Sequence, residues 1–440
     1  MRKQCGEINL IPVRNPLSFF FTTAYINLSS IFHFSKEFFL RPEKNYRKHL
    51  HLVLSGILTT VLLNTTQLPA KTIKAKSGNR NGIQESINNA PENATIVIPE
   101  GEFNFSGPRI NIDKSLTITG SGKKKTVLKK SSGLDWFFNV VADGFFRLTN
   151  IVLDGGKGGG GVQIRGDNLD FRVDHTTMKN FGTRAIQSWN GSRGVIDNNR
   201  FEENRITDIV VYGDNDKSWD KKANLGSADA TFIEDNVFEH KTVKNWHSVS
   251  SNNGSKYVFR YNTINDGKQN TTPVDAHGNK FFGRGSRTYE IYGNKINSEH
   301  SYMGMYIRGG TGVIYDNELT GDFSRPVTLT MESKSNSSYP AQDQIKDLYI
   351  WNNRVNGKNA TPFVTEGKAR ECVKENRDYF MKKKAGYTPY PYPHPARNEK
   401  RASITSKVKP RISNSLFGSD DGVKNGWSWL LEMLDFGRKG

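Results

Sequence analysis

The sequence contains few cysteines for its length, because its 440 residues include only Cys5 and Cys372. A disulfide scaffold is therefore excluded as the basis of the fold. The sequence also lacks a long apolar run. Its best candidate, residues 50–63, is shorter than the roughly 20 residues that cross a bilayer as a helix, so a comfortable membrane span is not expected there.

A concentrated positive charge is also missing from the centre of the chain. The net charge is +18, but most of it lies in residues 1–70 and residues 382–440. No stripe of Lys and Arg interleaved with aromatic residues crosses the centre, so nucleic-acid binding is not expected. A mildly basic body favours an acidic polymer outside the cytoplasm, such as a uronic-acid polysaccharide, as the partner.

The N-terminus has the features of a targeting segment. Basic residues precede residues 50–63, LHLVLSGILTTVLL, which have the length of a signal-peptide core. We predict a targeting segment over residues 1–70, with cleavage after Ala70 and a secreted, periplasmic or cell-surface location. An uncleaved N-terminal anchor is the alternative, because Leu68 is larger than the usual residue at that position. Residues 1–45 are long for a leading region and are interpreted as an overextended start.

Copies of one short phrase occupy the centre of the chain. Each copy is a β-favouring segment followed by Asn, any residue and an apolar residue, and one copy has Thr176 in place of Asn. Successive copies are 23 to 37 residues apart, which is typical of a stacked coil with loops of variable length. The copies are FRLTNIV (146–152), RVDHTTM (172–178), VIDNNRF (195–201), FIEDNVF (232–238), VFRYNTI (258–264), EIYGNKI (290–296), VIYDNEL (313–319) and YIWNNRV (349–355).

The composition of the phrase predicts strands. β-branched and aromatic residues recur at two fixed positions, which indicates side chains that point into a core. Asn tolerates positive φ and can bond its own backbone in a turn, so one Asn per coil predicts a ladder of stacked amides. A β-sandwich with Asn-rich turns is the alternative, although sandwiches do not repeat one phrase in register. We predict an all-β, single-stranded parallel β-helix over residues 71–381, expected to be monomeric.

Two segments are predicted to flank the coil. Ile83 and Ile87 lie on a short amphipathic helix that would cap the N-terminal coil. Residues 382–395, KKKAGYTPYPYPHP, are predicted to be an extended strap along the coil, because each proline fixes φ and removes a hydrogen-bond donor. A basic linker follows, and residues 427–436 are predicted to form a short amphipathic helix, so residues 382–440 make a third segment.

The order of the entry segments resembles that of a known superfamily. The capping helix, ATIVIPEGEF (94–103) and KSLTITGSG (114–122) are similar to the entry of right-handed parallel β-helix proteins of the pectate-lyase-like superfamily. The resemblance covers roughly residues 72–360 and implies a right-handed β-helix. It does not imply one reaction, because that superfamily contains lyases, hydrolases, esterases, epimerases and non-catalytic binders.

The layout between Trp246 and Arg308 resembles the alginate lyase and chondroitinase B family. That family has an SVxS strand, an RYNT coil, an HG turn and a glycine-flanked Ile-Arg strand in this order, as this chain does. The resemblance implies a lysine and an arginine as the proton-transfer pair, but this chain has Asn252 and Ala276 at the nearest positions. Either the catalytic pair has moved, or the chain belongs to a β-helix family with different chemistry.

β-Elimination on a uronate requires three kinds of side chain. The reaction needs a cation to neutralise the carboxylate, a base near the C5 proton and an acid for the leaving oxygen. Suitable side chains come from successive coils, and RGSR places two guanidiniums three residues apart. The predicted catalytic residues are His277, Arg287, Lys256 and Tyr302. The predicted substrate-binding residues are Arg284, Arg308, Arg260, His247 and Tyr292.

Each candidate has a structural alternative. His277 could cap a turn, Arg287 could pair with Glu290, and Lys256 could be a solvated surface charge, while His247 and His300 are isolated histidines. The third positions of the phrase could form sugar subsites through their aromatic rings, or a plain surface ladder. They are Asp197, Glu234, Arg260, Tyr292, Tyr315 and Trp351.

Carboxylates in the longest interval between copies of the phrase, the 37 residues from Asn199 to Asn236, suggest a metal site. Asp214, Asp216 and Glu234 could bind Ca²⁺ through oxygen ligands, although their spacing matches no fixed calcium loop and a solvated acidic loop is the alternative. Hydrolysis would need two carboxyl groups around one bond, and the only adjacent aspartates are in the tail. We predict a secreted polysaccharide lyase, with a β-helix glycoside hydrolase or a non-catalytic carbohydrate-binding solenoid as alternatives.

Overall fold

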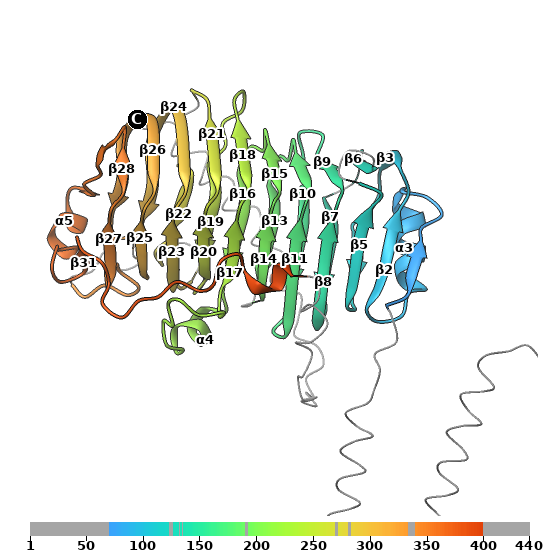
Figure 1. Cartoon of the computed structure of the whole chain (residues 1–440), viewed down its shortest axis with the longest axis horizontal. Helices are drawn as coiled ribbons and strands as arrows, with labels where there is room; N and C mark the ends of the chain where they lie inside the picture. Colours follow the sequence, from blue (N-terminus) through green and yellow to red (C-terminus); the bar gives the residue numbers. More distant parts are fainter. Residues whose placement is uncertain are drawn as a thin grey trace, which may run out of the picture. The chain divides into compact units, whose positions relative to one another are not determined.

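A computed structural model describes residues 70–398, except for residues 123–125, 132, 134, 190–191, 269–271, 280–282 and 333–338 (Figure 1). The signal-peptide core, the basic linker and the C-terminal helix lie outside the described residues. No helix in the described part is long and apolar enough to cross a membrane.

Twelve parallel strands form the first face of a coil, as Figure 1 shows. Successive strands in this sheet are separated in the sequence by the strands of the other faces, so each coil contributes one strand to it. The strands are β1 (Thr72–Lys74), β2 (Ala94–Ile98), β5 (Leu116–Gly120), β8 (Gly144–Thr149), β11 (Leu169–Asp174), β14 (Arg193–Asp197), β17 (Thr231–Glu234), β20 (Lys256–Arg260), β23 (Thr288–Tyr292), β25 (Thr311–Tyr315), β27 (Leu348–Trp351) and β31 (Tyr379–Phe380).

A second sheet of nineteen strands bends around the coil and supplies two further faces. The second face contains β3 (Gly101–Phe105), β6 (Thr126–Lys130), β9 (Val152–Asp154), β12 (Thr177–Lys179), β15 (Arg200–Glu202), β18 (Val237–His240), β21 (Thr263–Asp266), β28 (Arg354–Val355) and its antiparallel partner β29 (Lys358–Asn359). The third face contains β4 (Ile110–Ile112), β7 (Trp136–Val141), β10 (Gly160–Arg165), β13 (Arg184–Trp189), β16 (Thr207–Tyr212), β19 (His247–Asn252), β22 (Val274–Ala276) and β30 (Phe363–Val364).

Two long strands, β24 (Lys295–Ile307) and β26 (Glu318–Leu329), run through both of these faces. Their inward residues and those of the other strands stack into one fully buried apolar column. On the third face, for example, Ile209 pairs with Val249 and Val249 pairs with Val274, and none of the three is exposed. The prediction of a parallel β-helix is therefore confirmed.

The predicted amide ladder lies inside the coil, at the corner between the first and second faces. Asn236 donates from its backbone N–H and from Nδ2 to Oδ1 of Asn262, at 3.0 Å in both cases, and Asn262 binds Asn294 in the same way. These side chains are at most 3% exposed. The ladder satisfies backbone groups that the turn would otherwise leave buried and unpaired. It comprises Thr176, Asn199, Asn236, Asn262, Asn294, Asn317 and Asn353.

Two details of the repeat differ from the sequence prediction. Thr149 pairs with Asp174, so Asn150 aligns with His175 and the ladder position of that coil is Ile151. The positive φ also falls one residue before the ladder, for example at Asp235 with φ 56°. The Asn of the ladder is therefore selected for its amide, and the turn conformation is carried by its neighbour.

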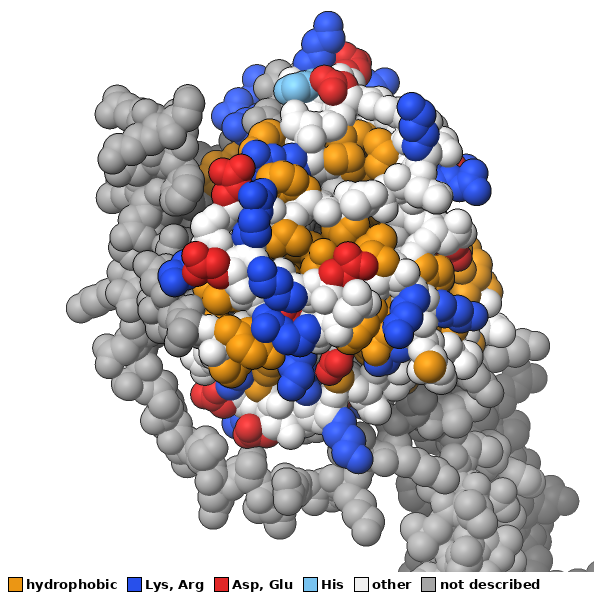
Figure 2. Space-filling view, turned by 90° about the vertical axis from the view of Figure 1, so that its left-hand side faces the viewer, with side chains coloured by type: hydrophobic (Ala, Val, Ile, Leu, Met, Phe, Trp, Pro, Cys, Tyr) orange, Lys and Arg blue, Asp and Glu red, His pale blue; other side chains and the backbone are white. Residues whose placement is uncertain are grey.

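The ends of the coil are closed by helices. Helix α3 (Arg80–Asn88) covers the N-terminal end through the buried side chains of Ile83 and Ile87, as the sequence predicts. Helix α5 (Lys368–Cys372) and β31 lie at the opposite end, which Figure 2 shows with Lys and Arg scattered among hydrophobic side chains. The thiol of Cys372 is free and buried.

The segment after residue 382 lies along the first face (Figure 1). We call residues 387–397 the strap, which ends in the short helix η1 (Pro395–Arg397). Arg260 donates to the carbonyl of Tyr390 at 2.7 Å, and the backbone N–H of His394 donates to Glu234 at 2.9 Å. The strap therefore binds outward-facing residues of the first face and shields them from water.

Candidate functional site

The first face is closed by the strap. Arg260 is 0% exposed and pairs with Glu234 at 2.6 Å, while Arg397 of the strap pairs with Glu234 at 2.8 Å. Tyr292 stacks on Tyr315 with ring centroids 4.6 Å apart. The predicted substrate-binding residues Arg260 and Tyr292 thus form a buried ladder, and the structure leaves them no open surface for a sugar.

The second face presents surface ion pairs. Arg200 donates to both Glu202 and Glu239, and all three side chains are partly exposed. Solvated pairs of this kind contribute little stability and leave no unpaired charge for a ligand. Neither the first nor the second face therefore offers an obvious reaction centre.

Polar side chains gather on the third face, at the C-terminal coils, around the carboxylate of Asp275 on β22. Asp275 is 0% exposed and accepts from Arg308 at 3.0 Å on Oδ1 and at 2.7 Å on Oδ2. Its Oδ2 also accepts from Ser250 at 3.0 Å and lies 2.8 Å from Nε2 of His277. We call this group, together with Glu332, His247 and Tyr306, the Asp275 cluster.

The strand register explains the cluster. Ser250 pairs with Asp275, and Asp275 pairs with Tyr306, so three neighbouring strands place these residues in one outward row. His277 and Arg308 follow directly after β22 and β24. Glu332 comes from the segment after β26, and it binds Arg308 at 2.8 Å and lies 3.2 Å from Nδ1 of His277. The structure therefore brings together His277, Arg308 and His247 of the predicted residues.

Opposite charges fix the protonation states of the cluster. Burial alone would raise the pKa of both carboxyl groups, but Arg308 and His277 hold the pKa of Asp275 well below its usual value and lower that of Glu332 to about 2. Burial and Arg308 disfavour a charged His277, but Asp275 and Glu332 raise its pKa overall. Both carboxyl groups are therefore ionised at neutral pH, and the pKa of His277 is raised above its ordinary value.

His247 is the basic group of the cluster. Burial lowers its pKa, so it is neutral where an ordinary histidine begins to be protonated. Its Nδ1 lies 2.8 Å from the carbonyl oxygen of Thr272. This oxygen accepts a hydrogen bond from the Nδ1 proton, so the lone pair of the neutral ring is on Nε2. Nε2 lies 3.7 Å from Asp275 Oδ2. The side chain as a whole is 17% exposed.

Tyr306 supplies a protonated phenol beside the cluster. Its ring lies under the guanidinium of Arg308, with 4.9 Å between the ring centroid and Cζ. Burial raises its pKa, an effect larger than the opposing one of Arg308. Tyr302 is on the same strand and is 37% exposed, and Arg325 lies over its ring at 5.3 Å. The predicted Tyr302 is therefore near the cluster but outside its hydrogen-bond network as described above.

An aromatic and basic row continues along the third face toward the N-terminal coils. Trp189 stacks on Tyr212 with ring centroids 4.1 Å apart, and Arg165 lies over Trp189 at 5.3 Å. These residues come from β10, β13 and β16, whose outward positions align with Asn252 of β19. The row supplies stacking surfaces beside the cluster, and the repeat phrase gave no sign of it because the phrase ends before the third face begins.

The RGSR arginines anchor an insertion. Residues 213–230 carry helix α4 (Asn215–Trp219), and Trp219 lies under Arg284 at 4.5 Å and Arg287 at 4.9 Å. Arg284 also pairs with Asp343 at 2.6 Å, and Arg287 donates to the carbonyl of Lys221 at 3.0 Å. The two guanidiniums therefore hold α4 against the coil, and their predicted grip on a substrate carboxylate has no geometric support.

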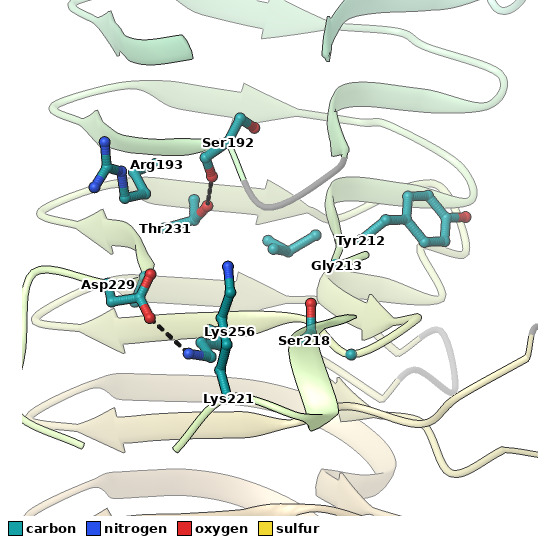
Figure 3. A pocket seen from close by; sticks show the side chains of 12 residues that line it. Ser192, Arg193, Tyr212, Gly213, Ser218, Lys221, Asp229, Thr231 and Lys256 are labelled. Carbon is teal, nitrogen blue, oxygen red and sulfur yellow. Dashed lines mark hydrogen bonds and ion pairs between the residues drawn. The ribbon is translucent and has the colours of Figure 1, made fainter. Parts of the chain in front are cut away.

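The insertion covers a pocket that Figure 3 shows. Lys256, a predicted catalytic residue, lies in this pocket and pairs with Asp229 at 2.6 Å. The pocket is bounded by Tyr212, so it adjoins the aromatic row. Lys256 lies on β20 of the first face, whereas Ser250 and Asp275 of the cluster lie on β19 and β22 of the third face.

The structure does not bring the predicted calcium ligands together. Glu234 is buried in ion pairs under the strap, Asp214 pairs with Lys217 at 3.2 Å, and Asp216 pairs with Arg284. Within the described ranges, no group of three or more His, Cys, Asp or Glu residues could hold a metal ion. The alternative of a solvated acidic loop agrees with the placement of Asp214 and Asp216.

Comparisons with known proteins assign no family to the chain. No protein-family model and no curated protein matches the sequence. A PL6 family polysaccharide lyase from Pseudopedobacter saltans is 12% identical, with 79% of this chain and 97% of that chain covered and a TM-score of 0.38.

Two further structures show how varied these proteins are. ORF18 of Geobacillus virus E2 is 12% identical, and the match covers 71% of this chain but only 63% of that chain, with a TM-score of 0.36. A GH87 alpha-1,3-glucanase from Streptomyces thermodiastaticus is 11% identical, covers 68% of each chain and has a TM-score of 0.34. Each is similar to this chain in fold, and none assigns a reaction to it.

Proposed function

We propose that this protein cleaves a uronic-acid polysaccharide by β-elimination at the Asp275 cluster. The observation that carries the proposal is a neutral histidine, His247, whose basic Nε2 faces the same cluster as the Arg308 cation and the Tyr306 phenol. These are the three kinds of group that elimination next to a carboxylate requires.

The roles follow from the protonation states. His247 takes the C5 proton through Nε2, because its Nδ1 already donates to Thr272. Arg308 offsets the substrate carboxylate through its positive charge, so that the C5 proton becomes acidic. Tyr306 delivers a proton to the departing glycosidic oxygen, which breaks the C4–O bond as the C4–C5 double bond forms.

Hydrolysis fits the cluster less well. A glycoside hydrolase needs one protonated carboxyl group as the acid and one carboxylate on the other side of the bond. The pKa values of Asp275 and Glu332 are both lowered, so neither carries a proton at neutral pH. Both are also held by the same guanidinium, Asp275 by Nε and Nη2 and Glu332 by Nη1, so each is already paired within the protein.

A substrate panel tests the proposal. The protein is incubated with alginate, pectate, glycosaminoglycans and glucuronan, and with carboxyl-reduced samples of the same polymers. We expect unsaturated uronates, detected by ultraviolet absorbance and mass spectrometry, from at least one acidic polymer and from none of the reduced samples. New reducing ends without unsaturated ends would show hydrolysis, and no cleavage of any polymer would overturn the enzyme assignment.

A further inference from the structure

Two glutamines on the third face have no role in the mechanism above, although they share a row with its centre. Gln163 of β10 and Gln187 of β13 pair in register, and they are only 6% and 3% exposed. The row continues through Val210 and Ser250 to Asp275, because each residue pairs with the next one across the sheet. The two amides therefore lie on the same outward row as the Asp275 cluster, on coils nearer the N-terminus.

The amide oxygens of both glutamines are already occupied. Arg109 donates to Oε1 of Gln163 at 2.9 Å, and Arg184 donates to Oε1 of Gln187 at 3.5 Å. Among the residues that the structure describes, no acceptor binds the NH₂ group of either amide. This part of the row therefore offers hydrogen-bond donors, which suit a ligand with acceptor atoms.

Arg165 adds a cation without a carboxylate partner. It follows Gln163 by two residues on β10, so it faces the same side of the sheet, and its Cζ lies 5.3 Å from the ring centroid of Trp189. Its Nε is buried without a hydrogen-bond partner, and no carboxylate in the described ranges forms an ion pair with Arg165. Asp135 does not supply the missing charge, because it pairs with Arg109 at 2.8 Å.

The free protein holds this cation in an unfavourable environment. Burial and the nearby guanidinium of Arg109 both lower the pKa of Arg165. A partly buried charge beside a like charge is destabilised, and a bound anion would relieve both effects. A guanidinium suits a carboxylate in particular, because its N–H groups can bind both carboxylate oxygens at once.

The distance from Arg165 to the Asp275 cluster indicates what kind of anion can use both. β13, β16 and β19 separate β10 from β22 along the third face (Figure 1), so the two points are roughly 19 Å apart at about 4.8 Å per strand. The outward residues between them on β16 and β19 are uncharged, namely Val210, Tyr212, Ser250 and Asn252. An extended polymer with a carboxylate on each unit can reach both points, whereas a single small anion cannot.

We propose that Arg165, together with the NH₂ groups of Gln163 and Gln187, binds a carboxylate of the polymer that lies over the Asp275 cluster. The inference rests on the proposed function for the identity of the polymer. Arg165 is then a specificity-determining residue, which favours acidic chains long enough to occupy both points. Bond cleavage does not pass through it.

Calorimetric titration tests the assignment. Full-length protein carrying His247→Asn, which removes the base and so prevents turnover, is titrated with uronate hexasaccharides from the polymers of the panel and with their carboxyl-reduced forms. Adding Arg165→Gln should weaken binding of an acidic hexasaccharide about tenfold, the order expected for a charge-assisted hydrogen bond, and should not change binding of the reduced form. Arg165→Lys, which keeps the charge but not the paired N–H groups, should give a smaller loss.

A matched variant and a stability measurement exclude indirect effects. Arg354→Gln is the control, because Arg354 is an exposed arginine of β28 on the second face, and we expect it to leave the affinity unchanged. The melting temperature of the ligand-free Arg165→Gln protein should stay close to that of its parent, because no ion pair is lost.

The outcomes separate this inference from the proposed function. Equal affinities of the Arg165→Gln and Arg354→Gln proteins, an equal loss for acidic and reduced hexasaccharides, or no binding of any hexasaccharide would overturn the assignment of Arg165. Cleavage of a panel polymer together with any of these results would leave the lyase standing. Acid-specific binding that depends on Arg165, in a protein whose His247 form cleaves none of the panel, would support the binding site and refute the lyase.

Discussion

The first and third faces of the coil carry the same kinds of side chain and use them differently. On the first face, Arg260 has no exposed surface and its nitrogens bind Glu234, Tyr292 and two carbonyls of the strap. On the third face, the side chain of Arg308 is 11% exposed and lies beside a neutral histidine. The same residue type is fully covered in one place and partly exposed in the other, because the strap covers only the first face.

The strap explains why the first face is closed. Arg397 pairs with Asp197 at 3.2 Å and with Glu234, and Tyr387 donates to Glu290. Asp197 and Glu234 also pair with arginines of neighbouring coils, Arg172 and Arg260, whereas Glu290 accepts from Tyr387 and from the backbone N–H of Gly226. A covered stripe of ion pairs stabilises the coil, whereas the uncovered third face is where a polymer can approach.

Removal of the base should give the largest effect. We expect His247→Asn to reduce kcat for elimination about 10³-fold, within the range for loss of a general base, with little change in melting temperature. Because the pKa of His247 is lowered, wild-type activity should persist below the usual histidine pKa and fall only at more acidic pH. His175→Asn is the control, since His175 is half-exposed on the first-face side. Full activity of the His247→Asn protein would remove the third face from the mechanism.

Breaking the covered ion pairs should affect stability alone. Arg260→Met leaves Glu234 with one cation and unpairs two strap carbonyls, so we expect a loss of about 3–5 kcal/mol in the free energy of unfolding. Denaturant titration measures this loss. The kcat of the folded variant should match wild type, and a selective loss of kcat would mean that the first face takes part in turnover.

Interrupting the amide ladder should destabilise both faces alike. Asn262→Ala removes the acceptor for two donors of Asn236 and the donor for the carbonyl of Ile233, so we expect a loss of about 2–4 kcal/mol. Asn265→Ala is a matched control, because Asn265 is a partly exposed residue of the same coil outside the ladder. If the ladder stabilised one face only, Asn262→Ala would speed amide hydrogen exchange on that face without lowering the global free energy of unfolding.

The last comparison concerns a buried histidine at the end of β18, on the second face, whose effect on stability appears only as the pH is raised. His240 lies 2.9 Å from Asp266 and 3.1 Å from Asp208, and these carboxylates outweigh burial and raise its pKa to about 10. Its contribution to stability is full below the unfolded pKa of 6.5 and is lost as pH rises through about 10. We expect unfolding free energy to fall by up to about 1.4 kcal/mol per pH unit in that window. The slope should be absent in His240→Gln.

The repeat phrase determined the fold because its spacing and composition report local requirements. Ile196, Ile233 and Ile291 face inward in successive coils as predicted, since a strand position repeated in register needs an apolar side chain. The alignment at Asn150 was wrong by one residue. Asn occurs both at the turn position and at the ladder position, and the sequence alone does not distinguish the two. Only the pairing of Thr149 with Asp174 separates the two roles.

The structure brings together three of the predicted site residues, all of which lie at the start of a third-face strand or directly after one. His277, Arg308 and His247 meet in one cluster, whereas Arg284 and Arg287 contact Trp219 of the insertion and Lys256 pairs with Asp229. Glu332 and Tyr306 were missed because they come from coils with no distinguishing motif. Tyr306 could have been found only from its pairing with Asp275, and Glu332 only from its position relative to the paired strands. Both require the strand register to be known.

The sequence by itself determined a stacked β coil, a polar ladder within it and a set of basic, imidazole and phenol groups on its later coils. The tertiary structure decided which of those groups stay accessible, because accessibility depends on segments far apart in the chain. The strap reaches back more than a hundred residues to cover Arg260, and the 213–230 insertion is held by arginines some seventy residues later. Such contacts leave no local pattern, since each is a match between two surfaces rather than a requirement of either segment alone.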